Sequence, residues 1–136
     1  MFLDIVVISG YFCAPLKKHQ GYQEYIALAK KMGNIVIAIH ANDNQCIRKY
    51  GKKMPRQMFE GCYNVIAIDE DDTVRETLTA IRKCFFSDRV IFYKDGGEYN
   101  KENLPEYGIE GVEYFFGISP KRDSSSKILG LNKKEC

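Results

Sequence analysis

Five short apolar runs, separated by segments with helical spacing, limit the folds open to this chain more than any other feature. The runs are Leu3–Ser9, Ile35–His40, Asn64–Ile68, Arg89–Tyr93 and Val112–Phe116. Most are nearly continuous in Val and Ile, which is typical of strands buried on both faces of a parallel sheet. The sequence therefore predicts an α/β fold in which strands and helices alternate.

Two longer helices are predicted between these strands, at Gly21–Met32 and at Thr73–Phe85. The first helix places Tyr22, Tyr25, Ile26, Ala29 and Met32 on one side and ends at Gly33. The second begins with a capping-box spacing and carries a stripe of Val74, Leu78, Ile81 and Phe85. Cys84 lies near that stripe and is expected in the core, and a weaker helix is expected near Lys101–Tyr107. We predict a single three-layer, doubly wound (Rossmann-like) domain with a five-stranded, mostly parallel sheet.

Composition bounds the class of protein. The chain has 136 residues, 45% of them hydrophobic and 28% charged, so we expect one domain over residues 1–130 and a frayed tail over 131–136. The formal net charge of +2 is too small to indicate nucleic-acid binding through overall positive charge. The apolar runs are too short to span a membrane, and Met1–Asp4 does not resemble a leader, so we expect a cytoplasmic protein. Five cysteines without a CxxC pair, and only two histidines, make a zinc site improbable.

Polar and glycine-rich segments follow the predicted strands, at the edge where doubly wound sheets bind ligands. They are Gly10–Gln20, His40–Asp43, Asp69–Thr73, Asp95–Asn100 and Gly117–Ser126. His19 stands directly before the helix that begins at Gly21. A helix amino end offers unpaired N–H groups and a positive potential, so this point suits a phosphate. His40 ends a strand at the same edge and is expected to be structural.

Several of these segments resemble signatures of one enzyme family. They are Gly10-Tyr11-Phe12, then His19-Gln20-Gly21-Tyr22, Ala41-Asn42-Asp43, Asp69 to Leu78, Gly96-Gly97-Glu98 with Pro105-Glu106, and Lys121 with Ser124-Ser125-Ser126. In this order they resemble the cytidylyltransferase-like nucleotidyltransferases, whose signature is His-x-Gly-His. The resemblance extends over almost the whole chain.

The resemblance implies a small nucleotidyltransferase that transfers CMP or AMP from a nucleoside triphosphate to a phosphorylated sugar or polyol and releases pyrophosphate. Mg²⁺ with CTP or ATP would be required, and small members of the family commonly form homodimers. The resemblance implies catalytic roles for His19 and Lys121. The implied nucleotide-binding residues are Gly10, Tyr11, Phe12, His19, Gly21, Tyr22, Asp95, Gly96, Gly97, Ser124, Ser125 and Ser126. We expect no metal ligands in the chain, because Asp69, Asp71 and Asp72 would stabilise a helix amino end instead.

Three departures from the family pattern support a second hypothesis. Tyr22 replaces the second signature histidine, the loop before His19 is longer, and the segment Lys52–Cys62 is short. These changes suggest a catalytically impaired nucleotide-binding module of the same fold. A flavodoxin-like or dinucleotide-binding domain is a third possibility, and the absence of a GxGxxG pattern after Ser9 weighs against the latter. Phe59, Tyr63, Phe115 and Phe116 are candidates for a dimer interface, although we expect them in the core.

Overall fold

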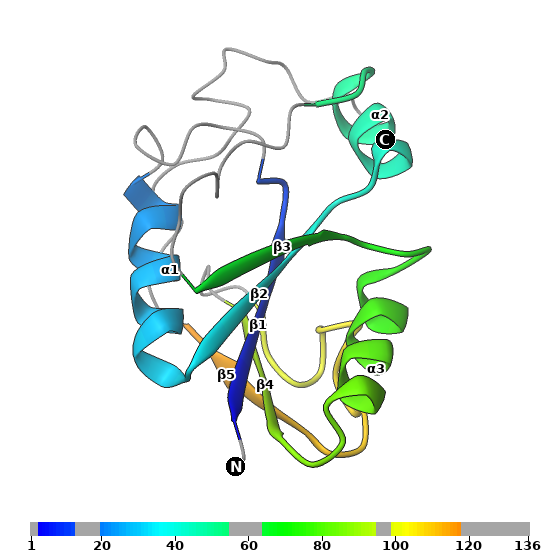
Figure 1. The fold of residues 1–136 in the computed structure, drawn as a ribbon. Coiled ribbons are helices and arrows are strands. Elements are labelled where there is room, and N and C mark those ends of the chain that lie inside the picture. Colours follow the sequence, from blue (N-terminus) through cyan, green and yellow to red (C-terminus); the bar gives the residue numbers. More distant parts are fainter. Residues whose placement is uncertain (1–2, 13–19, 55–63, 95–98, 118–136) are drawn as a thin grey trace.

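The computed structural model describes residues 3–12, 20–54, 64–94 and 99–117. In chain order the elements are β1 (Asp4–Gly10), α1 (Gln20–Met32), β2 (Ile35–His40), α2 (Asp43–Tyr50), β3 (Val65–Asp69), α3 (Val74–Cys84), β4 (Arg89–Lys94) and β5 (Val112–Phe116). The five strands form one sheet in the order β3-β2-β1-β4-β5, and every neighbouring pair is parallel (Figure 1). The predicted fold class is confirmed.

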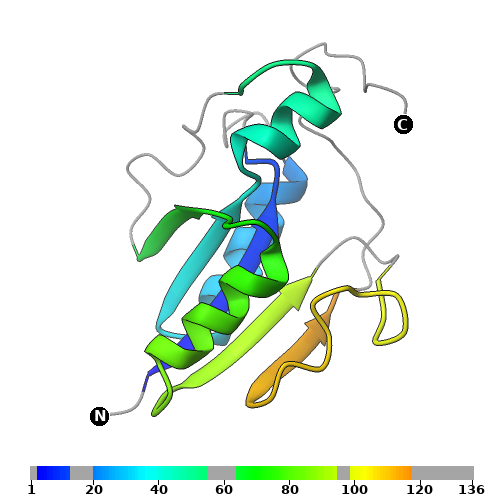
Figure 2. The same ribbon diagram turned by 90° about the vertical axis from the view of Figure 1, so that its right-hand side faces the viewer.

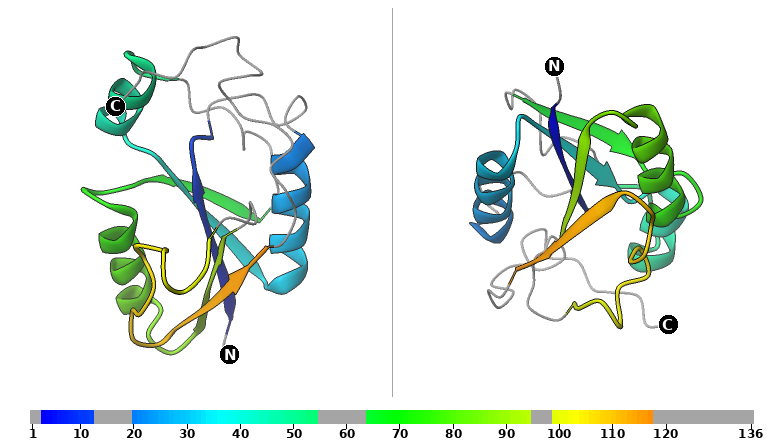
Figure 3. Two further views of the ribbon diagram at one scale, coloured as in Figure 1. Left: turned by 180° about the vertical axis from the view of Figure 1, so that it is seen from behind. Right: turned by 90° about the horizontal axis from the view of Figure 1, so that it is seen from below.

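The three central strands are apolar on both faces because a helix covers each face. Val6 and Ile8 of β1 pack in a first core cluster with Tyr25, Ile26 and Ala29 of α1. The alternate residues of the same strand pack in a second cluster with the buried stripe of α3. Successive side chains of a strand point to opposite faces, so a continuous apolar run fills both clusters. Figure 1 and the view from below in Figure 3 show α1 and α3 on opposite sides of the sheet.

Helix α3 begins and packs as its sequence predicts. The Thr73 side chain accepts a hydrogen bond from the Glu76 backbone N–H at 3.1 Å, which caps the amino end. Leu78 and Ile81 are buried against the sheet. Cys84 ends the helix and is exposed. The prediction of a core position for Cys84 was therefore wrong, because the partly buried Phe85 takes the packing position at this end of the helix.

The segment Lys101–Tyr107 forms turns, so the predicted helix there was also wrong. The Asn100 side-chain oxygen accepts hydrogen bonds from the backbone N–H groups of Glu102, at 2.9 Å, and of Asn103, at 3.1 Å. Such local bonds offer the backbone an alternative to the helix. Conversely, α2 was not predicted. It begins at the N-cap Asn42, whose side chain accepts from the Gln45 N–H, and it ends at Gly51, where φ is 83°.

Gly33 allows the end of α1 to lie directly against β1. A Cβ atom at this position would stand 2.6 Å from the carbonyl oxygen of Asp4 and 2.8 Å from a methyl carbon of Val6. The next residue, Asn34, donates its backbone N–H to the same Asp4 oxygen at 2.8 Å. Glycine is therefore required here by space, and this contact sets how α1 sits on the sheet.

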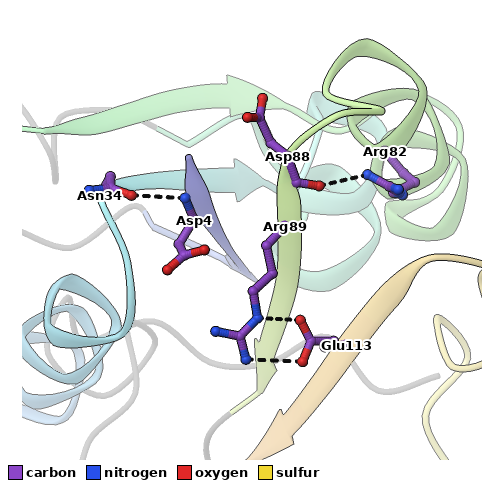
Figure 4. Close-up of polar contacts among 6 residues, drawn as sticks. All are labelled: Asp4, Asn34, Arg82, Asp88, Arg89 and Glu113. Carbon is purple, nitrogen blue, oxygen red and sulfur yellow. Dashed lines mark hydrogen bonds and ion pairs between the residues drawn. The ribbon is translucent and has the colours of Figure 1, made fainter. Parts of the chain in front are cut away.

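Polar contacts close the amino edge of the sheet (Figure 4). The Asn34 side chain accepts a hydrogen bond from the Asp4 N–H at 2.8 Å. Arg82 of α3 donates to the carbonyl oxygens of Phe85 and Asp88 at 2.9 Å each. Arg89 and Glu113 form an exposed ion pair between β4 and β5. These polar groups connect neighbouring elements at the amino edge. We therefore look for a ligand site at the opposite, carboxyl edge of the sheet.

Candidate functional site at the carboxyl edge

The sheet divides between β1 and β4 at its carboxyl edge. Their pairing ends at Val7 and Phe92, although β1 continues to Gly10 and β4 to Lys94. On either side the pairing continues, β1 with β2 to Gly10 and β4 with β5 to Lys94. Figure 2 shows β4 leaning away from β1 toward these ends. The division falls where the strand order reverses, which is the point at which doubly wound sheets bind ligands. We call it the β1–β4 crevice.

Three described side chains meet at the β1–β4 crevice. The ammonium group of Lys94 donates to the Ser9 hydroxyl at 3.4 Å, across the division of the sheet. The same ammonium lies 4.9 Å from the centre of the Tyr99 ring. Ser9 is buried, and Lys94 and Tyr99 are half-buried. The crevice thus carries a positive charge held between a hydroxyl and an aromatic face, a group suited to an anionic ligand.

The predicted turn after β1 lies at this edge, and its aromatic side chains serve packing. Phe12 is buried in the first core cluster. Tyr11 packs edge-to-face on Tyr50 of α2, with ring centroids 5.7 Å apart, and Lys49 lies 4.0 Å from the Tyr11 ring centre. Gly10 pairs with His40 of β2. What the turn offers a ligand at this edge is therefore chiefly its backbone.

Of the other predicted site residues, Gly21 and Tyr22 lie in the first turn of α1. That turn is at the carboxyl edge, as the parallel strand–helix–strand connection requires (Figure 1). The remaining ones lie outside the described residues: His19, Asp95, Gly96, Gly97, Lys121, Ser124, Ser125 and Ser126. The same holds for Phe59 and Tyr63 of the candidate interface, whereas Phe115 is 44% exposed on β5.

The sequence analysis named none of Lys94, Ser9 and Tyr99 as a site residue. Lys94 follows the predicted strand Arg89–Tyr93 and was assigned to no predicted element. The one local signal is a basic residue at the carboxyl end of a buried strand. Its contact with Ser9 joins residues 85 positions apart, which local patterns do not encode.

Polar groups beyond β2 and β3 form a structural cluster. The Asn42 backbone N–H donates to the Glu70 carboxylate at 3.3 Å, and the Asn42 side chain donates to the Asp71 carbonyl at 2.7 Å. His40 is buried, with its Nδ1 atom 2.5 Å from the carbonyl oxygen of Ala41. Burial raises the pKa of the Glu70 carboxyl group, against the opposing effect of the bond from Asn42. These bonds join α2 to the start of α3.

A hollow lies along β5 and is open to solvent. Its volume is about 590 Å³, and it is lined by Asn100, Lys101, Glu102, Tyr107, Val112, Glu113, Tyr114 and Phe116. The Tyr114 hydroxyl donates to the Glu106 carbonyl at 2.6 Å and accepts from the Ile109 N–H at 3.0 Å. Burial raises the pKa of this phenol. The hydroxyl therefore holds the adjoining turn in place.

Within the described ranges, no group of three or more His, Cys, Asp or Glu residues is placed to hold a metal ion. None of the helices in the same ranges is long and apolar enough to cross a membrane.

Comparison with known proteins supports the fold. No protein-family model matches the chain, and no curated protein matches it. Among solved structures, the chain is similar to the crystal structure of NadR protein in complex with NR, with a TM-score of 0.53 and 21% sequence identity. The match covers 93% of this chain and 39% of that one, so the present chain corresponds to well under half of NadR. At this identity the similarity shows a shared α/β, Rossmann-like fold.

Proposed function

We propose that this chain is a small nucleotidyltransferase that binds a nucleoside triphosphate at the β1–β4 crevice. The observation that carries the proposal is the division of an all-parallel sheet between Val7 and Phe92, with the Lys94 ammonium placed across it. The amino end of α1 lies at the same edge and would receive the phosphates. The structure of NadR, a protein crystallised in complex with NR, has a similar α/β fold, which is compatible with this proposal.

The proposed reaction transfers CMP or AMP to a phosphorylated sugar or polyol. An oxygen of the acceptor phosphate forms a bond to the α-phosphorus, and the bond from that phosphorus to the bridging oxygen of the β-phosphate breaks. The electron pair leaves with pyrophosphate. Such a transfer requires little covalent participation from the protein, which acts through positioning and charge stabilisation. An ammonium at the crevice and a helix amino end at the same edge of the sheet are suited to that task.

Magnesium would enter with the substrate. Mg²⁺ is commonly bound by one or two carboxylates together with substrate phosphates. Within the described residues, the acidic groups at this edge include Glu70 on the far side of β2, which already accepts a bond from Asn42. We therefore propose that the triphosphate itself supplies most of the ligands, and that the ion neutralises part of its charge.

Pyrophosphate release tests the proposal. The chain is incubated with each of four nucleoside triphosphates, Mg²⁺ and a panel of phosphorylated sugars and polyols. We expect release that depends on one triphosphate and one class of acceptor, and loss of that release in the His19→Ala variant. Binding of a triphosphate without release would favour the nucleotide-binding module instead. If none of the four triphosphates binds at millimolar concentration, both hypotheses are wrong.

A homodimer is a separate proposal and rests on the family resemblance alone. Sedimentation of the purified chain at several concentrations tests it, and a single monomeric species throughout the range would exclude it.

A further inference from the structure

Ser9 and Lys94 point toward the α3 face of the sheet. Residues two positions apart on a strand point to the same face of the sheet. Val7 lies two positions before Ser9 on β1, and Phe92 lies two positions before Lys94 on β4. Val7 and Phe92 both pack in the second core cluster under α3. The contact of 3.4 Å between Lys94 Nζ and Ser9 Oγ agrees with this placement, because two side chains that meet across the crevice must lie on the same face.

The amino end of α1 lies over the opposite face. Tyr25 and Ile26 of α1 pack in the first core cluster with Ile8 of β1 and Tyr93 of β4. The Tyr25 hydroxyl also donates to the Tyr93 carbonyl oxygen, which fixes α1 against β4 next to the crevice. A triphosphate whose β- and γ-phosphates are held at this helix end would leave its α-phosphate over the crevice, with the departing pyrophosphate on the α1 side.

The geometry of phosphoryl transfer then determines the direction of the acceptor. The attacking and leaving oxygens lie roughly in line on opposite sides of the phosphorus. The acceptor phosphate oxygen forms its bond to the α-phosphorus as the bond to the bridging oxygen breaks and the electron pair leaves with pyrophosphate. Since pyrophosphate leaves on the α1 side, the acceptor must approach from the α3 side, where the Lys94 ammonium lies.

We propose that Lys94, positioned by Ser9 and Tyr99, binds the phosphate group of the acceptor substrate. The inference rests on the proposed function and assigns one substrate of that reaction to one side of the crevice. Two anions must come together in this reaction, and a lysine ammonium is a compact charge that offsets their repulsion. The hydroxyl of Ser9 and the ring of Tyr99 hold the ammonium in place before the substrate arrives.

The test measures binding of phosphate and binding of the triphosphate in separate titrations. Inorganic phosphate is titrated by calorimetry into protein saturated with a non-hydrolysable triphosphate analogue and Mg²⁺, and the analogue is titrated separately. The variants are Lys94→Gln, Lys94→Arg and a control, Lys83→Gln, which removes the same charge from the exposed last turn of α3. Thermal unfolding without ligand shows whether each variant is folded.

We expect Lys94→Gln to weaken phosphate binding by about tenfold or more and to change binding of the triphosphate analogue by less than about threefold. Lys94→Arg and Lys83→Gln should bind phosphate nearly as the parent does. Unchanged phosphate binding in Lys94→Gln, or no phosphate binding by the parent, would overturn the inference. So would an equal loss of analogue binding, which would place Lys94 on the triphosphate instead.

Failure of the proposed function gives a different result. If the parent chain binds phosphate through Lys94 but binds no triphosphate, the nucleotidyltransferase proposal fails while the phosphate site at Lys94 stands.

Discussion

Replacement of Gly33 by alanine tests the joint that fixes α1 against β1. The added Cβ would lie 2.6 Å from the Asp4 carbonyl oxygen, which is about 0.8 Å short of the 3.4 Å at which ordinary contact begins. The Cβ would also lie 2.8 Å from the Val6 Cγ2 methyl group. The backbone must move, because the Asp4 oxygen belongs to the backbone and the branched Val6 side chain is stiff. Overpacking of this kind costs about 1–3 kcal/mol. Weakening of the bond from Asn34 N–H to Asp4 adds about 1 kcal/mol, partly offset by the lower chain entropy of unfolded alanine.

We therefore expect Gly33→Ala to lower the free energy of unfolding by about 2–3 kcal/mol and the melting temperature by roughly 6–15 °C. Urea and thermal unfolding followed by circular dichroism would measure both. Gly51→Ala is the matched control, because φ is 83° there and a Cβ would meet nothing within 4 Å. Its cost is conformational only, about 1 kcal/mol. A Gly33 variant as stable as the Gly51 variant would refute the argument from close approach.

Three further predictions concern contacts near the carboxyl edge. Asn42→Ala should lower the free energy of unfolding in urea by about 1–2 kcal/mol, because it removes the cap of α2 and the bond to Asp71. Asn42→Asp should keep part of this stability, because aspartate can also cap the helix. An alanine variant as stable as the parent would contradict the capping role of Asn42. Tyr25→Phe should cost about 1–2 kcal/mol by removing the donor to the buried Tyr93 carbonyl, and an unchanged urea midpoint would exclude that contribution. Glu70→Gln should raise stability at pH 7. The pKa of Glu70 is raised above 4.5 in the folded state, so the stability that its protonation provides is present below pH 4.5 and is lost as pH rises through the folded pKa. The advantage of glutamine should therefore vanish in unfolding experiments at pH 4, and an equal advantage at both pH values would count against burial as its cause.

The central strands could be predicted because continuous apolar runs in the sequence indicate strands that are buried on both faces. β1, β2 and β4 are continuous apolar runs, and the structure covers them on both faces. The helix α3 could be predicted from its cap and stripe. In contrast, α2 is eight residues long and mostly polar, so its periodicity was too weak to recognise, although Asn42 and Gly51 marked its ends.

The candidate site could be predicted only in part. Its location followed from a general property of parallel sheets, and the turn at Gly10 does lie at the divided edge. The side-chain roles were less accessible, because Phe12 and Tyr11 resemble signature residues while their rings pack against the core and against α2. Lys94 reaches Ser9 only through the tertiary fold.

The most direct test of the account maps where a triphosphate binds. Backbone amide signals of the isotope-labelled chain are followed by NMR during titration with Mg²⁺ and CTP or ATP. The account predicts that the largest shifts occur at Gly10 and in the first turn of α1. Shifts confined to the hollow along β5, or no saturable shifts at millimolar nucleotide, would contradict a nucleotide site at the β1–β4 crevice.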